Sequence, residues 1–158
     1  MSQFFIAVNS WLHELATVIF IGHYLLLSLL YLPVLAKEEP IVTAGTILSK
    51  ISKRSRIWLY VSLIVFIVTG IFLMLADPNY LGLANFGNLW GILMLFKHIL
   101  VLGMIAIGFW YNAILRVGPL MSSNTGASQT IGRFRFYSNL MAVCGVLVLL
   151  LTVIAQVE

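Results

Sequence analysis

The sequence carries very little charge. Only 9% of its 158 residues are Asp, Glu, Lys or Arg, whereas 61% are hydrophobic, and the mean hydropathy is +1.06. Soluble globular domains usually contain about 25% charged residues. This composition excludes an ordinary soluble domain and indicates that the lipid bilayer is the main partner of the protein.

Cysteine is almost absent as well. The single residue, Cys144, cannot form an intramolecular disulfide, so a fold stapled by disulfides is excluded. The chain also lacks a Gly-rich phosphate loop, a zinc-binding pair of His or Cys residues and a nucleophile elbow. If the protein carries out chemistry, we expect that chemistry inside the membrane.

The sequence does contain long apolar runs. Four runs approach or exceed the ~20 residues that a helix needs to cross the hydrocarbon core, namely 11–36, 57–76, 90–115 and 137–155. Each should be an α-helix, because a lone span must satisfy its own backbone hydrogen bonds. The sequence therefore predicts one all-α domain over residues 1–158, an integral membrane four-helix transmembrane bundle.

The basic residues indicate the orientation of the bundle. Apart from Lys97, they lie in the first and third loops, as Lys37, Lys50, Lys53, Arg54, Arg56, Arg116, Arg133 and Arg135. The positive-inside rule places these loops in the cytoplasm and both termini outside. We therefore predict a multi-pass protein of the plasma (inner) membrane, N-out and C-out. The net charge of +4 then reflects topology, and no nucleic-acid partner is expected.

Three segments between or near the spans predict local structure. Residues 37–56 should form a short amphipathic helix on the membrane surface, with Leu48 and Ile51 among the side chains that face lipid. The segment 122–130, SSNTGASQT, is typical of a polar linker. Pro33 should kink the last turns of the first span.

Four ionisable side chains lie inside the predicted spans. Lys97 and His98 are neighbours in the third span, and His13 and His23 belong to the first. Such a side chain costs about 2.5–3.5 kcal/mol on insertion scales, so it usually faces a partner, a cofactor or water within the bundle. These four residues are therefore the candidate cofactor-binding residues, and Glu14 is the expected partner of Lys97.

Depth along the first and third spans relates the histidines to one another. We count from Trp11 and Trp90, the expected markers of the outer interface, at 1.5 Å per residue. His13 then lies about 3 Å deep, His98 about 12 Å and His23 about 18 Å. Either histidine of the first span is thus within a tilt or a side-chain length of His98.

Three interpretations of these residues stay open. Each histidine can hydrogen-bond a neighbouring helix, as polar side chains in membranes commonly do. His13 or His23 can bind haem b axially together with His98, with Lys97 holding a propionate or an anionic substrate. Copper is the third interpretation, because imidazole plus thioether suits Cu(I) and Met94 lies four residues before His98 on one helix face.

Short motifs resemble the CopD-type copper-resistance membrane domains. The first helix of that family carries a Leu-His followed by a Gly, which His13 and Gly22 match. The third span is similar to the third helix of the family, with Lys97 near its start and Asn112 and Arg116 at its exit. The resemblance covers almost the whole chain and implies a four-helix membrane fold with copper chemistry.

The chain also resembles the related HemJ-type protoporphyrinogen oxidases. These four-helix membrane proteins share a first-helix His and a third-helix Lys, and Tyr31-Leu-Pro33 is similar to a Tyr-Leu-Pro near the end of their first helix. This second resemblance implies that haem b is a cofactor.

Together these observations predict a CopD-like protein that binds or handles copper in the outer half of the bundle, with His13, His98 and Met94 as metal ligands. The first alternative is a haem b-binding redox protein or oxidoreductase of the HemJ or b-type cytochrome kind. The second is a non-catalytic subunit that packs against other membrane subunits of a larger complex. Whether the protein is an enzyme, and on which small molecule, stays open at this point.

Overall fold

The computed structural model describes residues 2–35, 37, 41–82, 87–114 and 124–157. Within these residues the protein is α-helical and has no strand, which confirms the predicted all-α fold. The long helices are α1 (Gln3–Leu26), α3 (Ile41–Ala76), α4 (Leu89–Ile114) and α6 (Asn124–Val157). A π-helical turn, η1 (Leu27–Tyr31), and the short α2 (Leu32–Leu35) continue the line of α1.

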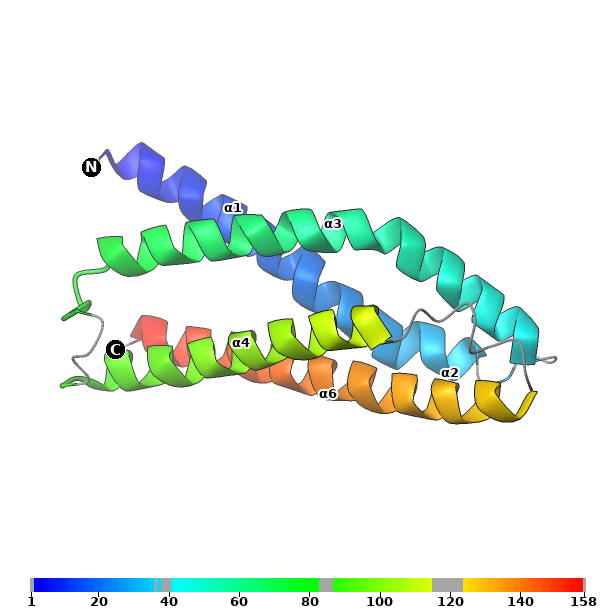
Figure 1. Ribbon diagram of the computed structural model, residues 1–158. Helices are drawn as coiled ribbons and strands as arrows, with labels where there is room; N and C mark the ends of the chain where they lie inside the picture. The colour runs from blue at the N-terminus through cyan, green and yellow to red at the C-terminus, as the bar shows by residue number, and fades with distance from the viewer. Residues whose placement is uncertain (1, 36, 38–40, 83–86, 115–123, 158) are drawn as a thin grey trace.

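Four helical segments are long and apolar enough to cross a membrane. They are Gln3–Leu35, Thr46–Ala76, Leu89–Trp110 and Gly132–Val157. Large apolar side chains such as Val18, Ile64 and Leu102 are more than 60% exposed, as expected of faces that contact lipid. The chain is therefore a multi-pass membrane protein. The start of α1 and the end of α6 lie at the same end of the bundle (Figure 1), as an even number of spans requires.

The helices extend beyond the predicted spans. The predicted separate surface helix over residues 37–56 is wrong, because residues 41–56 are the first turns of α3 and continue into the span without a break. Leu48, which we expected to face lipid, is 3% exposed and packs with Leu27, Leu32 and Phe134. No proline lies between Pro40 and Pro78, so nothing in the backbone ends the helix where the apolar run begins.

The predicted linker over residues 122–130 is wrong for the same reason. α6 begins at Asn124, and no proline follows Pro119. At the end of the first span, by contrast, the helix changes form. The π-helical turn η1 ends at Tyr31, two residues before Pro33, whose ring lacks an N–H and crowds the carbonyl one turn earlier.

The four spans pack unequally. α1 packs against α3 and α6, and α4 packs against α6; within the described residues, α4 has no extensive contact with α1 or α3. Figure 1 shows α1 running obliquely across the bundle, while α4 and α6 lie close together. A core cluster joins the spans and consists of Phe20, Ile21, Leu63, Met104, Met141 and Val148.

α6 approaches α1 closely at Gly145. A Cβ atom at this position would lie 2.7 Å from Cγ2 of Ile21, so only glycine lets α6 approach α1 this closely. Small residues commonly allow such contacts between membrane helices.

Candidate functional site

His13 is held firmly between α1 and α3. Its ring stacks on Phe66, with centroids 4.6 Å apart and planes at 21°. Its Nδ1 atom lies 2.9 Å from Oγ1 of Thr69. A Cβ atom at Gly70 would lie 3.1 Å from Cε1 of His13, so this glycine leaves the space that the ring occupies.

The hydrogen bonds of Thr69 determine which nitrogen of His13 carries the proton. Oγ1 of Thr69 lies 2.6 Å from the carbonyl oxygen of Val65, and two oxygens at this distance need a proton between them. The hydroxyl therefore donates to Val65 and accepts from Nδ1–H of His13. In a neutral imidazole, Nε2 then carries the lone pair. This is the tautomer in which a histidine binds a metal through Nε2 while its other nitrogen is held by a neighbouring acceptor.

Two further hydrogen bonds fix the surroundings of His13. Asn9 donates from Nδ2 to the backbone oxygen of Thr69 at 3.2 Å, one turn before His13 on α1. Thr17 donates from Oγ1 to the backbone oxygen of His13 at 2.7 Å. The seam between α1 and α3 is thus a continuous polar strip in an otherwise apolar region.

His98 is bound differently but exposes the same nitrogen. Its Nδ1 atom lies 2.6 Å from the backbone oxygen of Met94, and the side chain is exposed. A carbonyl oxygen can only accept, so Nδ1 is the donor and Nε2 of a neutral ring carries the lone pair. Met94 is half-buried on the same helix.

Counting from the observed helix starts brings His13 and His98 to the same level. α1 begins at Gln3 and α4 at Leu89, and both starts lie at the same end of the bundle (Figure 1). At 1.5 Å per residue, His13 lies about 15 Å and His98 about 14 Å along its helix. The sequence-based depth of about 3 Å for His13 was counted from Trp11, and α1 continues for two turns before that residue.

Lys97 does not pair with Glu14 as expected. Glu14 is exposed and Lys97 is half-buried, and among the described residues no ion pair joins them. Lys97 belongs to α4, directly before His98.

His23 lies apart from the other two histidines. It is half-buried on the far part of α1 and packs edge-on against Tyr24, with ring centroids 5.4 Å apart. The described residues contain no group of three or more His, Cys, Asp and Glu side chains that could hold a metal ion. The side chains of Asn112 and Arg116, which carry part of the CopD resemblance, lie outside the described residues.

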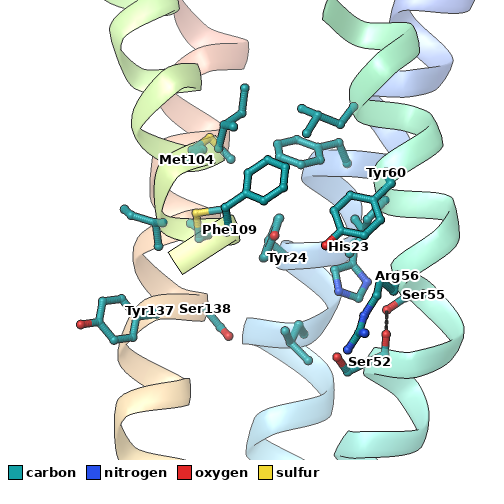
Figure 2. A pocket seen from close by; sticks show the side chains of 18 of the residues that line it. His23, Tyr24, Ser52, Ser55, Arg56, Tyr60, Met104, Phe109, Tyr137 and Ser138 are labelled. Atoms are coloured by element: carbon teal, nitrogen blue, oxygen red, sulfur yellow. Dashed lines mark hydrogen bonds between the residues drawn. The ribbon is translucent and has the colours of Figure 1, made fainter. Parts of the chain in front are cut away.

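A cavity opens beside His23 in the other half of the bundle. Its volume is about 80 Å³, and all four spans line it. Figure 2 shows its polar side chains, among them His23, Tyr24, Ser55, Arg56, Tyr60 and Ser138. Apart from His23, the sequence analysis singled out none of these as site residues. The only signal was that hydroxyl groups recur near the ends of several spans that adjoin the basic residues.

The sequence analysis also missed Thr69 and Gly70. Their adjacency in the second span is a weak signal, because small and hydroxyl residues are common in membrane helices. Only the packing of α1 on α3 brings them to His13.

Comparisons with protein-family models, with curated proteins and with solved structures found no match. The resemblance to CopD-type and HemJ-type proteins therefore stays a prediction from short motifs.

Proposed function

We propose that the protein binds haem b in the outer half of its bundle and acts as a membrane redox protein, with His13 and His98 as axial ligands. The observation that carries this proposal is the shared state of the two imidazoles. Each directs Nδ1 to an oxygen acceptor, which leaves Nε2 as the ligating atom. Their equal distance along α1 and α4, about 15 and 14 Å, supports the pairing.

Haem fits this arrangement better than a bare metal ion. A copper ion needs its protein ligands gathered within about 2–2.3 Å, as imidazole and sulfur ligands typically are in metal sites. α1 and α4 make no extensive contact within the described residues. A haem group instead spans the space between two helices and needs only one imidazole from each.

Copper remains the second candidate because of Met94. Its sulfur belongs to the same turn of α4 as His98, and the His98 ring is fixed to the Met94 backbone. Thioether and imidazole together suit Cu(I). In this case His13, His98 and Met94 would be the metal ligands, as the CopD resemblance implies.

The residues of the chain have distinct roles in the haem proposal. Thr69 and Phe66 orient the His13 ring, and Gly70 provides its space. Lys97, the neighbour of His98 on α4, offers a cation to a propionate or to an anionic substrate. The haem iron would supply one-electron chemistry, while the surrounding apolar side chains exclude water and so influence its potential.

An optical spectrum of the detergent-purified protein, followed by metal analysis of the same sample, tests the proposal. We expect a sharp Soret band and iron in about equimolar amount. His13→Ala and His98→Ala should change the spin state or lose the haem. His23→Ala is the matched control and should keep the spectrum, because His23 lies with the cavity near the other end of α1.

Two other results would redirect the assignment. Copper without a Soret band, lost in Met94→Ala and His98→Ala, would favour the CopD-like function. Folded and inserted His13→Ala and His98→Ala proteins that keep all bound haem or copper would refute both assignments. A non-catalytic subunit of a larger membrane complex would then be the leading interpretation.

A further inference from the structure

The cavity in the half of the bundle next to the basic loops has no role in the proposed haem site. We propose that it binds an anionic amphiphile from the cytoplasmic leaflet, with a phosphate or carboxylate head at Arg56 and an acyl chain among Phe20, Leu63 and Met104. Three features of the described residues support this proposal. They are the charge of the side chains that line the cavity, the buried hydroxyl of Ser138, and the order of polar and apolar groups along the depth of the cavity.

The charge of the cavity favours an anion. Among the described residues that line it, Arg56 is the only Lys or Arg, and none is Asp or Glu. Figure 2 shows Arg56 beside Ser52 and Ser55 of α3, with His23 facing them from α1. Guanidinium and hydroxyl donors together match the acceptor oxygens of a phosphate or carboxylate.

Ser138 supplies the second observation. Three polar side chains of the described residues are almost fully buried: Ser62, Thr69 and Ser138. Ser62 and Thr69 donate to carbonyl oxygens of their own helix at 3.0 and 2.6 Å. Ser138 is 3% exposed and has no such bond among the described residues, although an unpaired buried hydroxyl costs about 1–3 kcal/mol. Figure 2 shows it pointing between the helices, where it lines the cavity.

The groups are ordered along the membrane normal as in a lipid. Arg56, Ser52 and Ser138 lie toward the ends of their spans that adjoin the basic loops, whereas Phe20, Leu63 and Met104 belong to the central core cluster. The positive-inside rule makes this end cytoplasmic. A lipid of the inner leaflet would thus place its head and its chain in the order that the cavity offers.

The size of the cavity limits the ligand. A cavity of about 80 Å³ holds several water molecules, because on this measure about 10–15 Å³ suffices for one. It therefore accommodates the head group and a short stretch of one chain, while the remainder lies along the open side in lipid. Tyr24 bounds this space: its hydroxyl lies 3.5 Å from where a Cβ at Gly108 would be. A larger side chain at Gly108 should fill the cavity.

The test uses the full-length protein, purified and delipidated in a non-ionic detergent. Phosphatidylglycerol, oleate and phosphatidylcholine are titrated separately, and bound ligand is counted by native mass spectrometry. We expect an anionic amphiphile to bind at least tenfold more tightly than phosphatidylcholine. Binding of phosphatidylglycerol alone identifies a phospholipid, binding of oleate alone identifies a fatty acid, and binding of both assigns the site to the shared head-group chemistry.

Four variants locate the site. Arg56→Gln and Gly108→Leu should each weaken binding at least tenfold, and Ser138→Ala should weaken it severalfold. Arg54→Gln is the matched control, because Arg54 is exposed and does not line the cavity. If Gly108→Leu does not fold, Ser138→Ala and Arg56→Gln still decide the question.

Equal losses in Arg56→Gln and Arg54→Gln would overturn the proposal, since they would indicate unspecific attraction to basic residues. Binding of phosphatidylcholine as tight as that of the anionic probes would also overturn it, as would binding of a neutral quinone when neither anion binds. The haem spectrum should stay unchanged in Arg56→Gln, so failure of this proposal is distinguishable from failure of the proposed function.

Discussion

At the scale of single residues, the neighbours of His13 fix the orientation and the tautomer of its ring. The ring of His13 is stacked on Phe66 and bonded to Thr69, and the proton of Thr69 is already committed to Val65. The lone pair of the imidazole is therefore directed to Nε2 by residues of a neighbouring helix.

Replacement of Thr69 tests this control. Thr69→Val keeps the shape of the side chain but removes the acceptor for Nδ1–H. We expect cofactor affinity to fall about 10- to 100-fold, as for other partners that orient a ligating histidine. Thr69→Ser should restore it, because it keeps the hydroxyl. Bound cofactor is measured by optical titration of the purified apoprotein.

Thr152→Val provides the control for a general effect of losing a hydroxyl. Thr152 donates to the carbonyl of Val148 within α6 and is not among the contacts of His13. Equal affinity of Thr69→Val and Thr152→Val would show that Thr69 only fills space.

At the scale of helices, the fold depends on how closely α1 approaches its neighbours. Gly70 makes room for the His13 ring on α3, and Gly145 lets α6 reach Ile21. Gly103 and Gly22 have nothing within 4 Å of a built Cβ. Replacing glycines in similar sequence contexts should therefore have different effects, because the effect depends on which side chains surround each glycine in the folded protein.

Substitution of Gly145 should separate these cases. Gly145→Ala places a methyl group 2.7 Å from Ile21 Cγ2, and the overpacking should cost about 1–3 kcal/mol. The better helix propensity of alanine offsets about 1 kcal/mol of that cost. We expect a lower Tm in detergent, measured by circular dichroism. Gly103→Ala should be neutral or stabilising, and a Gly145→Ala protein at least as stable as Gly103→Ala would contradict the packing argument.

At the scale of the whole molecule, two polar regions lie at different depths of the bundle. Polar groups at the seam of α1 and α3 surround His13, whereas the cavity with Arg56 and Ser138 lies toward the basic loops. α1 carries His13 in the first region and His23 in the second, because this one helix extends through both depths. One span therefore connects the proposed haem site with the proposed lipid site.

The orientation of this arrangement follows from the positive-inside rule and is open to direct test. Alkaline phosphatase fused after Glu158 should be active, because the C-terminus is expected outside. The same enzyme fused after Met121 in a truncated chain should be inactive, and green fluorescent protein at that position should fluoresce. An active phosphatase after Met121 would reverse the assignment of the two ends.

The sequence alone determined the solvent, the number of spans and their approximate limits. Apolar runs such as 57–76 and 90–115 leave no other stable arrangement in a bilayer, since each must satisfy its backbone by forming a helix. The sequence also singled out four candidate cofactor-binding residues, because ionisable groups are rare inside such apolar runs. They are His13, His23, Lys97 and His98. The sequence misplaced the helix ends at Gln3 and Ile41, because a helix continues into water wherever no proline or glycine stops it.

Only the tertiary structure decided what those residues contact. Thr69 reaches His13 across 56 positions of sequence, and the hydroxyl of Ser138 lines a cavity formed by all four spans. Neither the contact of Thr69 with His13 nor the position of Ser138 in the cavity can be recognised from the neighbouring sequence. Every face of a membrane helix is apolar, so periodicity does not reveal which face contacts protein and which contacts lipid. The rotation of each helix about its axis is set by side-chain packing alone. That packing determines which ring nitrogen of His13 carries the lone pair and which side chains form the polar end of the cavity.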